Sequence, residues 1–203
     1  MKIFFNFSLN EYSNSYVLAP HKDSDAVLID PGQITLELIE KIERHRLNIK
    51  YILLTHYHHT HSQGVGTLLK IYKPVIYAKN PALYEYPVVG IEDNQLLELG
   101  ETVVECFHIP GHSMDSIVYK IENFIFSGDV LLAGSIGSTK EVINKALLLR
   151  GIKERLLTLD ERFLIFPGHG AISALKIEKL FNRDLIEATK EDDLQSLSHP
   201  SIV

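Results

Sequence analysis

The chain has one cysteine, no tryptophan, no excess of basic residues and no long apolar run, and each shortage excludes a class of protein. A single cysteine among 203 residues can form neither an internal disulfide nor a cysteine-based zinc site. A formal net charge of −6 argues against a nucleic-acid partner, because proteins that bind the phosphate backbone carry a basic surface. No stretch approaches the roughly 18 apolar residues of a membrane span, and no secretory signal pattern is present. We therefore expect a cytoplasmic protein that acts on a small molecule, with no membrane and no nucleic-acid partner.

The remaining composition is that of an ordinary globular protein. Hydrophobic residues make up 45% of the chain and charged residues 23%, which are average values for soluble domains. The length suits one domain with a full hydrophobic core. We predict a single domain over residues 1–188, followed by a polar and irregular C-terminal tail over 189–203.

Hydrophobic periodicity predicts strands and helices in a mixed order. Period-two or continuous apolar runs predict strands, and the apolar 49–55 segment is predicted to be buried on both faces. Apolar residues spaced three to four apart predict helices, beginning with an amphipathic helix over 33–45. Residues 79–100 fit no single element and are expected to form loop and short helix. The predicted strands are 3–7, 15–19, 26–30, 49–55, 74–77, 102–109, 116–121, 123–126 and 162–166, and the predicted helices are 33–45, 63–72, 140–158 and 174–188. This order favours one α/β (α+β) domain with sheets and helices in layers.

The chain has ten histidines, and four of them follow the predicted 49–55 strand within six residues. Side chains at i and i+2 of an extended segment lie on the same side, so His56 and His58 can converge on one ion. His61 can reach a neighbouring ion after a turn. Imidazole is the commonest ligand of zinc and also suits iron. His59 is either a plain loop residue or an additional ligand.

Three further motifs place polar side chains at the ends of predicted strands. They are Pro110-Gly111-His112, Gly128-Asp129 and Pro167-Gly168-His169-Gly170. Sheets fix such residues while glycine-rich turns leave them accessible, which is typical of catalytic sites. Asp129 taken alone could equally be a turn residue or a helix N-cap.

Together these motifs resemble the signature of the metallo-β-lactamase superfamily, including the early Asp30-Pro31-Gly32 turn. The segments FSGDVLLAGSIG (126–137) and FPGHG (166–170) are most similar to the glyoxalase II-like hydrolase branch. The resemblance implies a four-layer αββα sandwich with a metal site along one edge of its two sheets. It also implies one or two bound metal ions, zinc in the first place, with iron or manganese as alternatives.

The resemblance also implies which residues bind the metals. His56, His58 and His112 would hold the first metal and His61 and His169 the second, with Asp129 bridging the two. The signature aspartate that normally precedes the last histidine of the first motif is replaced by Thr60. Because threonine is a poor ligand, the second site is expected to be empty, weakly filled with water in place of the carboxylate, or completed by His59.

The implied activity is attack of a metal-bound hydroxide on an ester, thioester or related carbonyl. Asp129 and His59 are the candidate catalytic residues, with His59 taking over proton transfer from the missing aspartate. Two alternatives remain open at this point. One is a mononuclear iron enzyme similar to persulfide dioxygenases, which would use His56, His112 and Asp129. The other is a degenerate, non-catalytic metal-binding protein.

Overall fold

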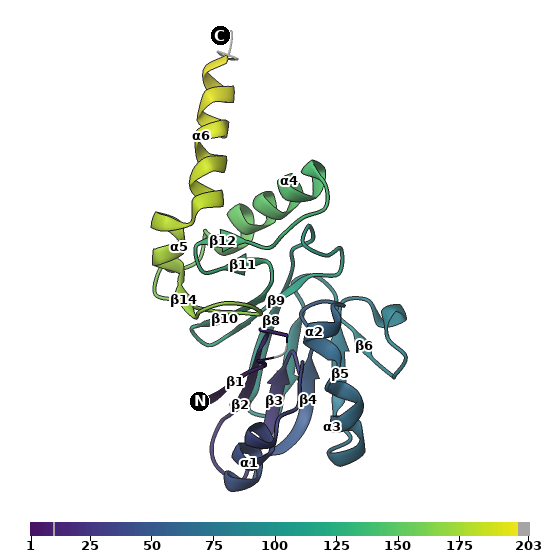
Figure 1. Ribbon diagram of the computed structural model, residues 1–203. Coiled ribbons are helices and arrows are strands. Elements are labelled where there is room, and N and C mark those ends of the chain that lie inside the picture. Colours follow the sequence, from purple (N-terminus) through teal and green to yellow (C-terminus); the bar gives the residue numbers. More distant parts are fainter. Residues whose placement is uncertain (10, 199–203) are drawn as a thin grey trace.

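The computed structural model describes residues 1–9 and 11–198, and its two six-stranded sheets pack face to face (Figure 1). In the first sheet the order is β1-β2-β3-β4-β5-β6, with antiparallel pairing up to β3 and parallel pairing from β3 onward. The strands are β1 (Lys2–Phe7), β2 (Asn14–Ala19), β3 (Asp25–Ile29), β4 (Asn48–Leu53), β5 (Val75–Ala78) and β6 (Val89–Gly90).

The second sheet has the order β14-β13-β10-β9-β8-β7, and only its β10–β13 pair is parallel. A two-stranded ribbon of β11 (Leu131–Leu132) and β12 (Ser135–Ile136) follows β10 in the chain. The strands of the second sheet are β7 (Leu96–Leu99), β8 (Thr102–His108), β9 (Ile117–Ile121), β10 (Phe124–Gly128), β13 (Leu164–Pro167) and β14 (Ser173–Ala174).

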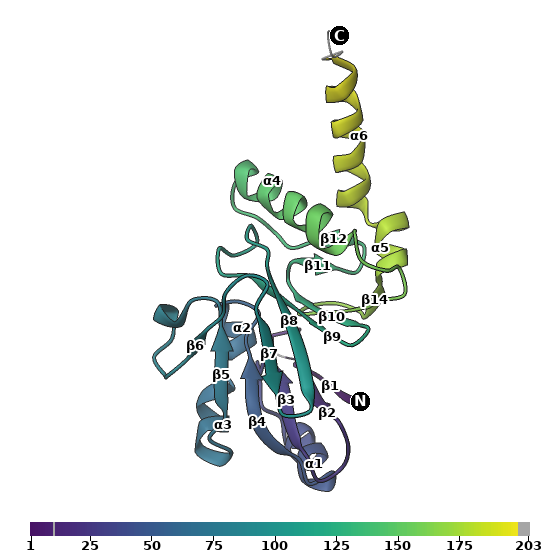
Figure 2. The same cartoon turned by 180° about the vertical axis from the view of Figure 1, so that it is seen from behind.

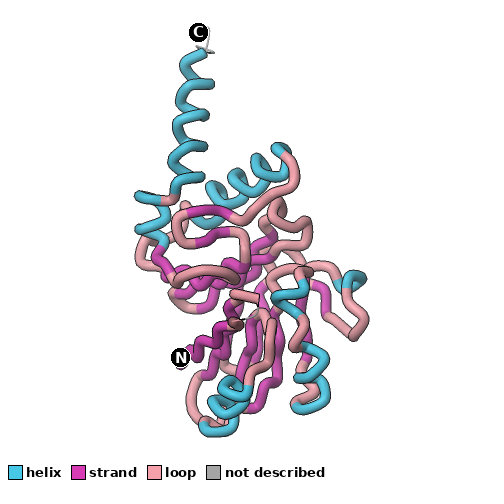
Figure 3. The backbone as a smooth tube through the Cα atoms, viewed as in Figure 1, coloured by secondary structure: helices cyan, strands magenta, loops and turns pink. Residues whose placement is uncertain are grey.

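Helices cover the outer face of each sheet, which completes the four layers (Figures 2 and 3). The helices α1 (Leu36–Arg44) and α3 (Val65–Ile71) bury their apolar faces on the first sheet. The second sheet is covered by α4 (Val142–Gly151), its π-helical continuation η2 (Ile152–Leu156) and α5 (Leu175–Phe181), with the start of α6 (Arg183–Ser198). The short helices α2 (His59–Ser62) and η1 (Pro81–Leu83) complete the list. This arrangement confirms the predicted αββα sandwich.

An aromatic cluster joins the two sheets. The Tyr16 ring packs edge-on against Phe126 and Phe166, at centroid distances of 5.4 and 5.3 Å. The Tyr16 hydroxyl donates a hydrogen bond of 2.6 Å to the Pro167 carbonyl. Since Pro167 ends β13 just before the Gly168-His169 turn, this bond fixes a strand end of the second sheet against the first.

Several predicted elements differ from the structure in detail. Strand β4 is buried on both faces only at Ile52 and Leu53, whereas Lys50 is exposed and pairs with Asp25 of β3 at 2.6 Å. The ambiguous 79–100 segment contains the edge strand β7, in which Leu97 and Leu99 are buried and their neighbours exposed. This alternation was visible in the sequence but is short.

The predicted helix 174–188 is two helices. Asn182 takes an extended conformation between α5 and α6, and its side-chain amide donates to Glu178 and to the Ser135 carbonyl. Helix α6 then continues to Ser198, across the domain boundary predicted at residue 188, and residues 199–203 of the predicted tail lie outside the described part. In the described part, no helix has the length and apolar character needed to cross a membrane.

Candidate metal centre

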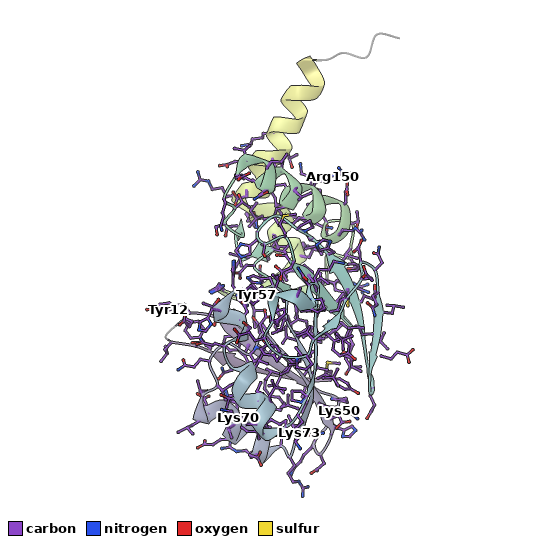
Figure 4. The ribbon with its side chains drawn as sticks, turned by 90° about the vertical axis from the view of Figure 1, so that its right-hand side faces the viewer. Tyr12, Lys50, Tyr57, Lys70, Lys73 and Arg150 are labelled. Atoms are coloured by element: carbon purple, nitrogen blue, oxygen red, sulfur yellow. The ribbon has the colours of Figure 1, made fainter. Side chains whose placement is uncertain are left out.

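The candidate ligands lie where strands of both sheets end. His56 follows β4 of the first sheet, while Asp129 and His169 follow the paired strands β10 and β13 of the second. Backbone hydrogen bonds join these ends, from the Ile117 amide to the Thr55 carbonyl at 2.8 Å and from the Gly168 amide to the Gly128 carbonyl at 2.7 Å. Tyr57 stands between His56 and His58 in the sequence, and Figure 4 shows it near the junction of the two halves of the molecule.

Four side chains form a first group whose candidate ligand atoms all lie within 4.8 Å of one another: His56, His58, His112 and Asp129. His58 Nδ1 lies 2.8 Å from His56 Nε2 and 3.1 Å from His112 Nε2. Asp129 Oδ2 lies 3.9 and 3.6 Å from the same two Nε2 atoms. Three imidazole nitrogens and a carboxylate oxygen therefore face one small space.

Hydrogen bonds on the far side of the rings decide which nitrogens carry protons. His112 Nδ1 lies 2.9 Å from the Ser138 carbonyl oxygen, which can only accept, so Nδ1 carries the hydrogen. The Thr55 hydroxyl donates to Asp30 Oδ2 at 2.7 Å and accepts from His56 Nδ1 at 3.0 Å. Both rings therefore direct an Nε2 lone pair into the group, an arrangement that a cation stabilises.

A second group consists of His61, His169 and, again, Asp129. His169 Nδ1 lies 2.8 and 3.0 Å from the two Asp129 carboxylate oxygens. His61 Nε2 is buried, makes no hydrogen bond, and lies 3.5 Å from Asp129 Oδ2. A buried ring nitrogen without a partner is costly unless a ligand satisfies it, so both groups fit a divalent metal.

Asp30 connects the two groups from behind. Its carboxylate is 2% exposed and accepts hydrogen bonds from the Thr55 amide, from the Thr55 hydroxyl and from His61 Nδ1 at 2.7, 2.7 and 2.9 Å. It thus sets the ring orientation of His61 directly and that of His56 through Thr55. A carboxylate behind a histidine in this way raises the basicity of the ligand nitrogen.

Several residues that shape the site carry no ligand signal in the sequence. A Cβ at Gly168 would lie 2.4 Å from the His61 ring and 2.7 Å from Asp129 Oδ1, so only glycine allows these two side chains to approach. The Ser138 carbonyl and the Thr55 hydroxyl become identifiable only once their histidine partners are placed. Of the residues that shape the site, only Gly168 stood in a motif, Pro167-Gly168-His169-Gly170, that marked it as part of the site.

Thr60 and His59 lie outside both groups of ligand atoms. The Thr60 backbone carbonyl accepts a hydrogen bond from the Ser13 hydroxyl at 3.0 Å, which holds this turn against the start of β2. The exposed His59 ring lines a separate cavity of about 300 Å³ together with Tyr57, Tyr84 and Tyr86. The proton-transfer role of His59 therefore stays a prediction.

Burial and nearby charges shift the pKa values of the two groups in different directions. Burial lowers the pKa of His56 well below its ordinary value, and the neighbouring imidazoles add to this; the pKa of His58 is lowered for the same reasons. Burial also opposes protonation of His61, but the Asp30 and Asp129 carboxylates outweigh it and raise its pKa to about 10. Burial disfavours the Asp129 carboxylate, yet His169 and His61 hold its pKa well below the usual range.

This difference predicts unequal pH dependence of metal binding. In the metal-free protein His61 is an imidazolium at neutral pH and must lose a proton to bind a metal, whereas His56 and His58 are already neutral. Affinity at the second group should therefore fall about tenfold for each pH unit below about pH 10, and affinity at the first group should change less. Metal titrations between pH 6 and 9 with a proton-release readout would measure this. An equal pH dependence for the first and second equivalents of bound metal would contradict this prediction.

The comparisons with known proteins agree with this geometry. The family model described as the metallo-beta-lactamase superfamily matches residues 10–169. A hydroxyacylglutathione hydrolase of Tolumonas auensis is 29% identical over an alignment of 164 residues, and the match covers 77% of this chain and 61% of the hydrolase.

Solved structures extend the similarity to the whole fold. The crystal structure of the BLEG-1 B3 metallo-beta-lactamase is 29% identical, covers 91% of this chain and 99% of its own, and has a TM-score of 0.78. A di-iron-bound form of TTHA1623 is 26% identical, covers 89% and 98%, and has a TM-score of 0.76. With two sheets enclosed by helices and a histidine and aspartate cluster at their common edge, this chain belongs to the metallo-beta-lactamase superfamily.

Proposed function

We propose that the protein is a metal-dependent hydrolase that cleaves an ester, thioester or related carbonyl compound. The observation that carries the proposal is that two groups of ligand atoms share Asp129 beside an open cavity of about 550 Å³. Similarity to hydroxyacylglutathione hydrolases supports the reaction class. Because this chain matches only 61% of the length of the Tolumonas hydrolase, a glutathione thioester is not proposed as the substrate.

The residues of the site would have different roles in such a reaction. A divalent ion held by these ligands supplies Lewis acidity and lowers the pKa of a bound water. His58 and His112 form part of the cavity wall, so a carbonyl group that enters the cavity lies beside the ligand atoms. The ionised Asp129 carboxylate, hydrogen-bonded by His169 Nδ1, can orient the attacking water and accept a hydrogen bond from it at Oδ1 or Oδ2.

Metal content and activity measured together test the proposal. Protein purified without added metal would be analysed for zinc, iron and manganese and assayed with a panel of neutral thioesters and esters. Hydrolysis that a chelator abolishes and zinc restores would support the proposal. A protein that holds its metal yet hydrolyses none of the panel would instead support the non-catalytic binding alternative.

An iron oxygenase is the second candidate, because part of the first group matches the ligands of such enzymes. Two histidines and one carboxylate around an iron suit oxygen chemistry, and His56, His112 and Asp129 supply such a set. The di-iron form of TTHA1623 is a similar fold that holds iron. Oxygen uptake by the iron-loaded protein with a persulfide, without thioester hydrolysis, would favour this candidate over the hydrolase.

Thr60→Asp is expected to strengthen the second group. The second group has two neutral histidines and a share of one carboxylate, so an added carboxylate next to His61 should raise its metal affinity about tenfold or more. Metal analysis after dialysis against a mild chelator would measure this, with Thr60→Asn as the uncharged control. Retention of two equivalents by the natural protein under the same dialysis would show that Thr60 does not weaken the site.

His59→Ala tests the predicted proton transfer. If His59 replaces the missing aspartate in this role, its loss should lower turnover about a hundredfold while the metal content stays the same. Tyr86→Phe, in the same cavity, is the matched control and should leave both unchanged. An unchanged rate in His59→Ala would remove His59 from the reaction.

A further inference from the structure

A second cavity, of about 300 Å³, lies beside His59 and is lined by none of the candidate metal ligands. It lies between α2, the start of α3 and the segment that leads from η1 to β6 (Figure 1). The metal centre does not account for its aromatic character. We call it the tyrosine cavity, and its lining includes Tyr57, His59, Gly66, Tyr84, Glu85 and Tyr86.

The three tyrosine rings of this cavity lie side by side. The Tyr84 ring packs edge-on against Tyr57, with centroids 5.0 Å apart, and lies tilted beside Tyr86 at 5.5 Å. Tyr84 and Tyr86 also pack against the core between the first sheet and its helices, whereas Tyr57 is 47% exposed. Because the face of an aromatic ring carries partial negative charge, rings gathered in this way attract a cation.

The charged groups of the lining also favour a cation. Glu85 is exposed and forms no ion pair with any of the described residues. No lysine or arginine from the described part of the chain lines the cavity, and His59 is the only lining side chain able to become cationic. The larger cavity beside the metal ligands is lined by Lys79 and Lys140 instead. A small cation is therefore expected to bind in the tyrosine cavity rather than in the larger one.

Gly66 leaves the tyrosine cavity open at the start of α3. A Cβ at this position would meet no atom within 4 Å. The backbone here is helical, so residues other than glycine fit without strain. A longer side chain at position 66 would therefore stand at the cavity and change its charge or its free space while leaving the three rings in place.

We propose that the tyrosine cavity binds an organic cation that carries a quaternary ammonium group. Such a group has no N–H to donate, so aromatic faces and a nearby carboxylate bind it better than hydrogen-bond acceptors do. Tyr57, Tyr84 and Tyr86 supply the ring faces and Glu85 supplies the negative charge. The site is independent of the proposed hydrolase function, because it contains none of the candidate metal ligands.

Choline and its neutral isostere 3,3-dimethyl-1-butanol test the proposal. Their dissociation constants would be measured by calorimetry on the metal-bearing protein, at pH 8 and at one chloride concentration. The two compounds share their shape and their hydroxyl group, so contact of the hydroxyl with the metal would affect both alike. We expect choline to bind about tenfold more tightly or better, because only choline carries the charge that the rings attract.

Variants at Gly66 test the charge preference with the rings intact. Gly66→Lys places an ammonium group at the open position of the cavity and should remove the advantage of choline over its isostere. Gly66→Ala is the uncharged control and should retain this advantage. Since the readout is binding, hydrolysis of a substrate does not enter the result, and failure of the hydrolase proposal would leave this test unaffected.

Variants at Tyr86 test the contribution of an aromatic ring. Tyr86→Leu removes one ring face and should weaken choline binding about fivefold or more, whereas Tyr86→Phe keeps the ring and should bind choline as the natural protein does. Circular dichroism would establish that both variants fold. Equal binding of choline and its isostere by the natural protein would overturn the proposal, as would an advantage of choline that persists in full in Gly66→Lys or in Tyr86→Leu.

Discussion

Asp129→Asn should lose most of its bound metal and hydrolyse substrate about a thousandfold more slowly, a loss of about 4 kcal/mol of transition-state stabilisation. Asp129 is the only acidic residue in either group of ligand atoms and belongs to both. It is 7% exposed, so bulk water cannot take its place readily. Asparagine keeps the shape of the side chain but removes the charge that balances a divalent ion. Both groups should therefore weaken together, whereas loss of His58 or His169 should weaken only one.

Metal analysis and kcat/KM of the purified variant would measure this effect. Asp184→Asn is a suitable control, because Asp184 is a nearby carboxylate that accepts the Ile136 amide and pairs with Lys145 at 3.4 Å but lies in neither group. Circular dichroism would establish that both variants fold. If Asp129→Asn kept two metal equivalents and its rate, the shared carboxylate would not be the centre of the site.

Asp30→Ala should destabilise the protein and weaken metal binding at the same time. The substitution leaves the buried Thr55 amide, the Thr55 hydroxyl and His61 Nδ1 without their acceptor. A buried donor without a partner costs about 1–3 kcal/mol, and three in one network are expected to lower the free energy of unfolding by about 3–5 kcal/mol. Loss of the carboxylate behind a histidine ligand typically lowers metal affinity by about 10- to 100-fold.

Asp30→Asn separates the two effects. Its amide oxygen can still accept from the Thr55 amide, so more of the stability should be retained. Its NH2 group then takes the place of Oδ2 and can accept from neither the Thr55 hydroxyl nor His61 Nδ1–H, so metal affinity should remain low. Urea denaturation and competitive metal titration would measure the two quantities. Asp25→Asn, in an exposed pair with Lys50, is the control and should change stability by less than about 0.5 kcal/mol. Unchanged metal affinity in both Asp30 variants would exclude a positioning role for this carboxylate.

Local pattern in the sequence predicts most of the elements that carry the site. The period of about 3.6 in residues 33–45 matches α1, whose N-cap Thr35 accepts from the Leu38 amide and whose Leu38 and Ile42 are buried. The apolar runs before the histidine motifs match β4, β10 and β13. Short-range propensity was insufficient for β7, a four-residue edge strand whose pairing with β8 defines it. It was also insufficient for the break at Asn182, which depends on hydrogen bonds to residues of another element.

The candidate ligands likewise separate what local sequence pattern predicts from what it does not. The order and spacing of the histidine motifs singled out His56, His58, His61, His112, Asp129 and His169, and the structure brings their ligand atoms together in two groups. Spacing could not separate His59 from its neighbours, because α2 begins at that residue and the exposed ring lines another cavity. The early Asp-Pro-Gly turn indicated that Asp30 orients a ligand histidine, but not which one, because its partners Thr55 and His61 lie 25 and 31 positions away.

The sequence by itself determined the class of most of the elements that carry the site, the αββα fold through its motifs, and the residues able to bind a metal. These features depend on side-chain chemistry and on periodicity over a few residues, which the linear chain already contains. Only the tertiary structure decided which ring nitrogens converge at the candidate metal centre, that Asp30 contacts residues of both groups, and that Lys79 and Lys140 line one cavity. Those contacts arise because two separately ordered sheets pack face to face, which brings together residues that no local pattern relates.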